Sequence, residues 1–228
     1  ASVPNGYMTM CAIIKTIKIF CETADILGLD DAREYAELPN RLIASLPNDG
    51  MKYIPYDGCF ETSVGLMGGI YPFDVIDKDN ELQRGGIDSY FINENKTGNM
   101  YAVGTGVCPW YKVWKAIVLG RLGETEAAYQ AIKSTINNTG NFDEMYEIND
   151  CETGTIFRPW FGTAAGMFIQ AVNEMFVKYE NGLIYIGASL PQEINNFSCR
   201  LAVSNGIIVE ATVQNGNIVR LRLASRTN

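Results

Sequence analysis

The sequence contains no histidine. This absence excludes Ser-His-Asp triads, Cys-His nucleophile pairs and zinc sites built on histidine. The cysteines have no Cys-x-x-Cys spacing, so we expect neither a metal ion nor another cofactor. The six cysteines are Cys11, Cys21, Cys59, Cys108, Cys151 and Cys199. Carboxylates are therefore the main candidates for acid and base chemistry.

Positive charge is also scarce: 18 Lys and Arg face 26 Asp and Glu, which gives a net charge of −8. We therefore expect no nucleic-acid partner, because binding to a phosphate backbone depends on basic residues. No apolar run approaches the roughly 18–20 residues that a membrane-spanning helix needs. With 47% hydrophobic and 19% charged residues, the composition is that of a globular protein. The sequence leaves open whether its compartment is cytoplasmic, periplasmic or extracellular.

Apolar residues recur at spacings of three and four over much of the first 178 residues, which is the period of amphipathic helices. Gly28 is placed to cap the first helix, and Pro39 should kink or split the second. Short turns join the helices into successive hairpins. The helices expected from this pattern cover residues 10–28, 30–46, 61–70, 81–91, 109–122, 124–136 and 167–178.

The pattern changes near residue 182, where short alternating or apolar runs begin. These runs cover residues 183–186, 198–203, 207–213 and 218–223. Asn205-Gly206 and Asn215-Gly216 are strong signals for hairpin turns between strands. We therefore expect a mainly α protein whose helical hairpins are followed by a small antiparallel β-sheet, a meander of about four strands. The domains expected are 1–180 and 181–228.

A loop rich in carboxylates precedes the last expected helix. Its acidic residues are Asp143, Glu144, Glu147, Asp150 and Glu152. Arg158 and Trp160 follow them. Sugar cleavage requires carboxylates at the anomeric carbon, and a Trp ring can cover the apolar face of a pyranose. The alternative interpretation is that these residues are solvated loop acids in a chain that is acidic throughout.

Several short motifs resemble the glucoamylase-like glycosidases, whose catalytic domain is an (α/α)6 barrel of six helical hairpins. Residues 109–116, PWYKVWKA, are similar to a helix of that family that opens on Pro-Trp. Residues 119–126, LGRLGETE, resemble its ARLGDxE turn, and residues 140–144 fall where it has Gly-Leu-x-Pro-Glu-Gln. Residues 61–74 resemble its segment before the fifth hairpin. Residues 182–228 are more similar to the β-cap of the fucosidase and maltose-phosphorylase families, which share the barrel.

The resemblance implies a partial (α/α) toroid and an inverting glycoside hydrolase that acts on an oligo- or polysaccharide. It implies that Glu144 is the general base that activates water. Asp143 and Met145 stand where the family has Pro and Gln, so Glu147 and Asp150 are alternative bases. The general acid of the family lies upstream of the matched motifs. We therefore expect this chain to be a C-terminal portion whose partner is the N-terminal half of the same protein.

The resemblance also implies a set of residues that contact the carbohydrate substrate. Trp160 is expected to stack on a sugar ring, and Trp110 either lines the same site or belongs to the core. Arg158 either hydrogen-bonds sugar hydroxyls or pairs with Asp150 to hold the loop. Glu61 either contacts the substrate or opens a helix, where its charge would favour the helix dipole.

Two other functions remain open from the sequence. A non-catalytic carbohydrate-binding or scaffold fragment would keep the aromatic residues without the general acid. A sugar phosphorylase would need a basic phosphate pocket, and only the resemblance of the β-cap favours it. A lyase of the helical-toroid type would need Tyr together with His or Arg at the position of the base. The absence of histidine disfavours it.

Overall fold

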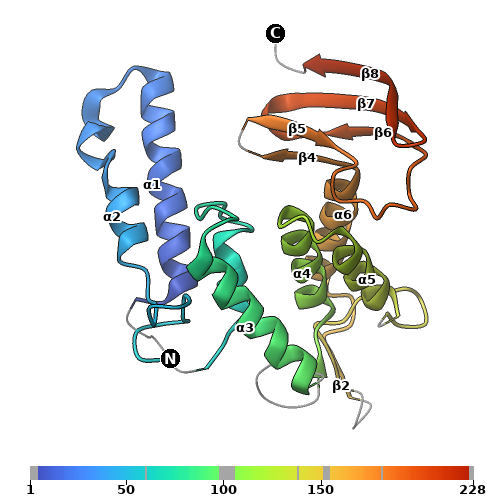
Figure 1. Ribbon diagram of the computed structural model, residues 1–228, viewed down its shortest axis with the longest axis horizontal. Helices are drawn as coiled ribbons and strands as arrows, with labels where there is room; N and C mark the ends of the chain where they lie inside the picture. Colours follow the sequence, from blue (N-terminus) through green and yellow to red (C-terminus); the bar gives the residue numbers. More distant parts are fainter. Residues whose placement is uncertain are drawn as a thin grey trace. The chain divides into compact units, whose positions relative to one another are not determined.

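The computed structural model describes residues 5–59, 61–97, 106–137, 139–150, 155–180 and 182–225. Its contacts divide the chain into two compact units, Ala1–Gly106 and Val107–Asn228. Figure 1 shows that helices dominate the first unit, whereas the second combines helices with antiparallel strands. The chain is therefore mainly α with small antiparallel sheets, as the sequence predicts.

The first unit is built on one long helix. Its elements are α1 (Tyr7–Leu27), η1 (Asp30–Tyr35), α2 (Leu38–Ala44), η2 (Val64–Gly69) and α3 (Glu81–Thr97), where η denotes a 3-10 helix. Gly28 ends α1 as predicted, because it adopts the left-handed conformation at φ 68° and its N–H bonds the Asp25 carbonyl. Pro39 lies in the first turn of α2, so the predicted split of the second helix is confirmed. α1 packs against η1, α2 and η2.

The helix predicted over 61–70 is wrong in type and extent, because only the 3-10 helix η2 forms there. Its three glycines make an α-helix costly. Ser63 caps η2, since its Oγ accepts the Gly65 N–H at 3.2 Å. Glu61 therefore lies in a bend that precedes η2 and does not open a helix.

A buried chain of hydrogen bonds links α1, α3 and η2. The Tyr7 hydroxyl donates to Gln83 Oε1, and Gln83 Nε2 donates to the Leu66 carbonyl at 2.7 Å. All three residues are almost completely buried, so their polar atoms must find partners inside the protein. The core around them includes Cys11, Ile14, Leu46, Tyr53, Val75 and Ile76.

Gly69 passes so close to this chain of hydrogen bonds that no side chain fits. A Cβ atom there would collide with the Tyr7 hydroxyl and Gln83 Oε1, and it would lie 3.0 Å from Ile76 Cγ1. We expect Gly69→Ala to lower the free energy of unfolding by about 1–3 kcal/mol, because overpacking forces neighbours out of their rotamers. Urea unfolding followed by far-UV circular dichroism measures this loss.

Gly68→Ala is the matched control for this prediction. A Cβ at Gly68 would make only ordinary contacts of 3.5 Å with Met8 and Phe73. We therefore expect a smaller loss for this variant than for Gly69→Ala. Equal losses would mean that backbone conformation, and not the contact with Tyr7, decides the cost.

The helices of the second unit pack around α4 (Pro109–Arg121). α4 contacts both α5 (Thr125–Ile136) and α6 (Gly162–Phe176). The ends of α4 and α5 lie within one residue of the predicted ranges 109–122 and 124–136. α6 begins five residues before the predicted start at Met167, because the small residues at 162–166 are helical and not a turn. The predicted end at Lys178 is also wrong, since residues after Phe176 form a strand.

The strands of the second unit form separate antiparallel sheets. β1 (Gly106–Val107) lies at the junction of the two units, and β2 (Ile148–Asp150) pairs with β3 (Thr155–Phe157). β4 (Val177–Glu180) pairs with β5 (Leu183–Ile186). β6 (Phe197–Ala202), β7 (Ile207–Gln214) and β8 (Asn217–Ser225) form a meander in that order, and the 3-10 turn η3 (Ser204–Gly206) joins the first two.

The predicted meander of four strands is therefore corrected to three strands and a separate hairpin. β5 pairs with β4, whose first two residues fall within the predicted helix over 167–178. Asn215 and Gly216 form the expected tight turn, with φ of 49° and 74°. The two sheets share a small core around Val177, Val209 and Ala211.

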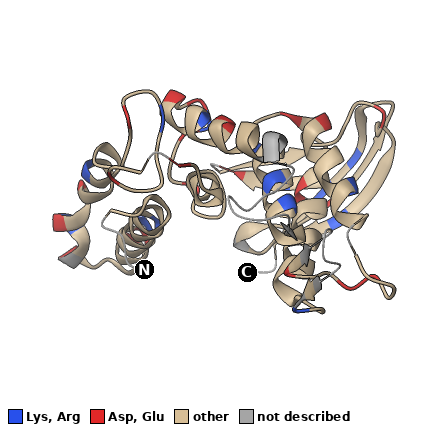
Figure 2. Cartoon of the chain, turned by 90° about the horizontal axis from the view of Figure 1, so that it is seen from below, with Lys and Arg blue, Asp and Glu red and all other residues tan. Residues whose placement is uncertain are grey.

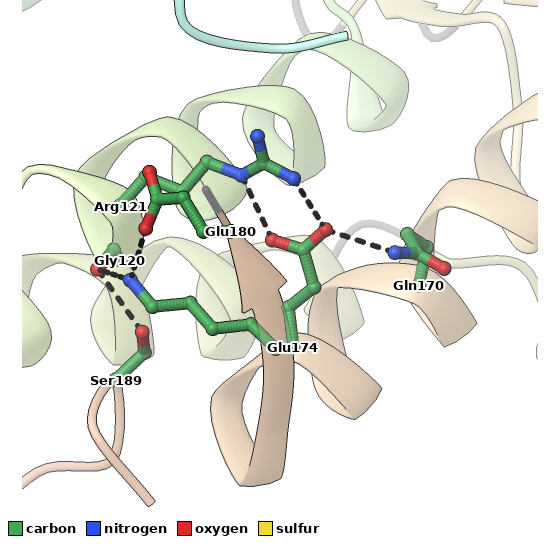
Figure 3. A network of polar contacts seen from close by, with 7 residues as sticks. Gly120, Arg121, Gln170, Glu174, Glu180 and Ser189 are labelled. Carbon is green, nitrogen blue, oxygen red and sulfur yellow. Dashed lines mark hydrogen bonds and ion pairs between the residues drawn. The ribbon is translucent and has the colours of Figure 1, made fainter. Parts of the chain in front are cut away.

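A buried ionic network joins α4, α6 and β4 (Figure 3). Arg121 donates from Nη2 to Glu174 Oε1 at 2.9 Å and from Nε to Oε2 at 3.0 Å. Gln170 Nε2 donates to the same carboxylate at 2.9 Å. Lys178 Nζ lies 3.3 Å from Glu180 Oε2. Each charged side chain in this network is at most 12% exposed, so its partners replace water.

The boundary expected between residues 180 and 181 lies inside the second unit and stays a prediction. Contacts cross it on both sides. β4 pairs with β5, and the Gly120 carbonyl accepts hydrogen bonds from Lys178 Nζ at 3.5 Å and Ser189 Oγ at 3.0 Å. In the structure, the residues before and after this position therefore share one compact unit.

Charged residues of both signs occur on both units (Figure 2). Within the described ranges, no helix combines the length and the apolar character that crossing a membrane requires. The same residues contain no group of three or more Cys, Asp or Glu side chains arranged to hold a metal ion.

Candidate functional site

The loop rich in carboxylates is folded into two consecutive antiparallel turns. Thr139 forms an isolated bridge with Met145, and β2 and β3 pair further along the chain. Two backbone hydrogen bonds then connect the loop to the residues before α6. The Glu147 N–H donates to the Arg158 carbonyl at 3.3 Å, and the Phe161 N–H donates to the Met145 carbonyl at 2.8 Å. The backbone therefore holds Glu147 beside Arg158.

Glu147 and Arg158 also form an ion pair, with 2.6 Å between Oε2 and Nη1. The Glu147 side chain is 22% exposed, whereas Arg158 is 72% exposed. The charge of Glu147 also acts on Tyr111 of α4. Burial raises the pKa of the Tyr111 hydroxyl, and Cys108 and Glu147 raise it further. Tyr111 therefore keeps its proton at neutral pH.

Aromatic rings gather at the N-terminal end of α4, around Trp110. The centroid of its ring lies 5.2 Å from Tyr111, 5.9 Å from Phe161 and 6.2 Å from Trp114. Trp110 is half-buried, so it contributes to the core and still reaches the surface. Its Nε1 is buried and has no hydrogen-bond partner within the described part of the chain. Such a donor costs free energy unless water or a ligand accepts its proton.

Trp160 lies on the surface, with 67% of the residue exposed. Trp160 and Arg158 both adopt left-handed backbone conformations, at φ 64° and 47°. This conformation is unfavourable for residues that have a Cβ, and it persists only where the surrounding structure imposes it, often at functional sites. The exposed indole offers an apolar face with a polar N–H, which suits contact with a sugar ring.

Glu144 is held by its own loop. Its Oε2 accepts the Phe142 N–H at 2.9 Å, and its carboxylate lies against Gly140, where any Cβ would collide with it. The Tyr146 hydroxyl is also close. Burial raises the pKa of Tyr146, and the Glu144 carboxylate adds to this effect. Glu144 therefore has contacts within its own loop, whereas Glu147 pairs with Arg158.

The remaining predicted site residues are placed differently. Asp150 is the last residue of β2, but its side chain lies outside the described part of the structure. Arg158 pairs with Glu147, so the predicted pair with Asp150 stays a prediction. Glu61 belongs to the first unit, where it lines a cavity of its own.

Sequence reasoning missed Tyr111, Tyr146 and Phe161. Tyr111 and Phe161 each follow directly after a Trp that was singled out. Paired aromatic residues at the start of a helix could have signalled them. Tyr146 lies between the two candidate carboxylates in the sequence, but nothing there indicated that its hydroxyl would lie near Glu144.

Three solved structures of glycosidases have a fold similar to that of this chain. A wild-type glycosidase has a TM-score of 0.60 and 13% identity, and the match covers 82% of this chain and 53% of that chain. A single-residue glycosidase variant also gives a TM-score of 0.60 with 13% identity, and the match covers 75% of this chain and 52% of that chain. Another variant, in complex with glucose, gives 0.60 with 12% identity, again covering 75% and 52%.

At such low identity these likenesses show a shared fold. The chain spans about half the length of each glycosidase. No protein-family model and no curated protein matches the sequence.

Proposed function

We propose that this chain is part of a glycoside hydrolase of the (α/α) toroid type, which cleaves an oligo- or polysaccharide with inversion. The observation that carries the proposal is the position of Glu147. Its carboxylate is held by Arg158 and contributes to the raised pKa of Tyr111, whose ring contacts the half-buried ring of Trp110. The fold shared with glycosidases supports the same reaction class.

In this proposal a carboxylate removes a proton from water while the water attacks the anomeric carbon. Glu147 is the base that its surroundings favour, and Glu144 and Asp150 are the alternatives. The general acid protonates the leaving oxygen from a carboxyl group roughly 6.5–9.5 Å away, which leaves room for the water. We place this acid on a part of the protein that precedes the present chain.

The other proposed roles concern substrate binding. Trp160 stacks on a sugar ring, and Trp110 Nε1 donates its unpartnered proton to a substrate oxygen. Arg158 orients the Glu147 carboxylate and presents its remaining N–H groups to sugar hydroxyls. Tyr111 can donate a hydrogen bond to the water or to the substrate. Glu61 is proposed to contact substrate through the cavity of the first unit.

The stereochemistry of the product tests this function. We expect the complete protein that contains this chain to release a sugar whose anomeric configuration is opposite to that of the bond it cleaves. Proton NMR during the first minutes of reaction measures the anomer before mutarotation. Retention of configuration would contradict the two-carboxylate inverting mechanism, and the absence of any product across α- and β-linked oligosaccharides would contradict the hydrolase.

The second candidate is a non-catalytic carbohydrate-binding fragment. One observation favours it: both candidate carboxylates already have partners in the chain, the Phe142 N–H for Glu144 and the Arg158 guanidinium for Glu147. In that case oligosaccharides would bind to the complete protein without turnover, and the binding would depend on Trp160.

A further inference from the structure

A cavity of about 390 Å³ lies within the first unit, between the first turn of α1 and the residues that precede η2. Its volume is at the lower end of the roughly 300–1,000 Å³ that is usual for ligand pockets. Polar groups line part of it, from Thr9, Tyr56, Cys59, Glu61, Thr62 and Ser63. Such a volume suits a molecule of the size of one or two sugar rings.

Thr62 carries an unpartnered hydroxyl at this cavity. Its Oγ1 is buried and has no hydrogen-bond partner among the described residues. By contrast, the neighbouring Ser63 Oγ already accepts the Gly65 N–H. A buried hydroxyl without a partner is unfavourable, so a molecule in the cavity that both accepts and donates hydrogen bonds would relieve the cost.

The charges around the cavity restrict what it can bind. Among the described residues that line it, Glu61 is the only charged one, and none is Lys or Arg. A phosphate or carboxylate ligand would therefore meet repulsion from the Glu61 carboxylate. A neutral ligand avoids this cost.

The remaining groups at the cavity fit a hydroxylated ring. Leu66, Pro55 and Met8 supply apolar surface for C–H groups. The neighbouring Cys59, burial and then Glu61 raise the pKa of Tyr56, so its phenol keeps a proton to donate at neutral pH. The Cys59 thiol donates to the Glu61 carbonyl at 3.7 Å.

We propose that this cavity binds an uncharged sugar ring through the Thr62 hydroxyl and the Glu61 carboxylate, and that it excludes uronic acids and sugar phosphates. The choice of a sugar rests on the proposed function, and the exclusion of anions rests on the lining residues alone. The substrate of the protein is then a neutral glycan.

Saturation-transfer NMR titrations of this chain with D-glucose, D-glucuronate and D-glucose 6-phosphate test the proposal. We expect glucose to bind, and both anions to bind at least tenfold more weakly. Thr62→Val should weaken glucose binding about tenfold, because one hydrogen bond is lost and a ligand hydroxyl is left unpaired. The same variant should keep or raise the thermal midpoint, because it removes an unpartnered hydroxyl.

Thr16→Val is the matched control. Thr16 is an exposed threonine of α1 outside the cavity, and its Oγ1 already bonds the Ala12 carbonyl at 2.9 Å. The glucose affinity of Thr16→Val should equal that of the unaltered chain. Glu61→Gln is a second variant at an exposed position, which does not depend on the core. It should relax the discrimination against glucuronate and glucose 6-phosphate.

Several outcomes would overturn the proposal: no binding of glucose, equal affinity for the anions, or unchanged glucose affinity in Thr62→Val. These outcomes are independent of hydrolysis, since binding is measured without turnover. If the complete protein releases product while Thr62→Val binds as before, the cavity proposal fails and the glycosidase proposal stands. If glucose binds as expected but no product forms, the reverse holds.

Discussion

Replacing Glu147 with Gln is expected to lower kcat for glycoside hydrolysis by about 10²–10⁴-fold in the complete protein, the range usual for a general acid or base. The amide has nearly the shape of the carboxylate but cannot accept a proton from water. KM should change little, because Trp110 and Trp160 remain. The release of reducing sugar measures the rate, and tryptophan fluorescence confirms that the variant is folded.

Two further substitutions make this experiment decisive. Glu144→Gln should have a smaller effect, because Glu144 is engaged with Phe142 and Gly140 in its own loop. Glu126→Gln is the control. Glu126 is exposed on α5, and within the described part of the chain its carboxylate accepts a hydrogen bond from Gln130. If Glu144→Gln abolishes turnover while Glu147→Gln retains it, the base is Glu144, as the sequence motif indicated.

Truncation of Glu174 to Ala is expected to lower the free energy of unfolding of the second unit by about 3–5 kcal/mol. The variant leaves the Arg121 guanidinium buried without its bidentate partner and deprives Gln170 of its acceptor. Tryptophan fluorescence during urea unfolding reports on this unit alone, because all three tryptophans, Trp110, Trp114 and Trp160, belong to it.

Arg200→Ala supplies the comparison for an exposed ion pair. Arg200 is 71% exposed and bonds Glu210 across the sheet, so its loss should cost no more than about 1 kcal/mol. Replacing Arg121 and Glu174 together by Met should recover most of the stability, since neither charge of the pair is then left buried without its partner. A loss below 1 kcal/mol for Glu174→Ala would mean that water reaches Arg121 in the folded state.

The strongest sequence predictions concerned α4 and α5, whose apolar stripes repeat with the helical period over twelve or more residues. Other elements failed for local reasons. The predicted helix over 167–178 misses the start of α6 because Gly162 and Gly166 lie in its first turns, and glycine is a poor helix former in isolation. Val177 continued the apolar pattern of the preceding helix, and only its pairing with Ile186 makes it a strand.

The candidate site was predictable in composition but not in pairing. The sequence singled out Glu147 and Arg158, yet their pairing depends on backbone hydrogen bonds between residues eleven or more positions apart. A shift of the hairpin by a few residues would have given Arg158 another acid. Local patterns carry no information on such a register, because several acids of the loop have similar surroundings in the sequence.

The direct passage from helix to strand at Phe176 and Val177 limits how the β4–β5 hairpin can move relative to α6. No loop residue separates α6 from β4, and Lys178 reaches back to the Gly120 carbonyl of α4. A swinging flap needs a few residues that absorb changes in φ and ψ, and this junction supplies none without unwinding the last helical turn. The β4–β5 hairpin thus continues α6 without a hinge between them.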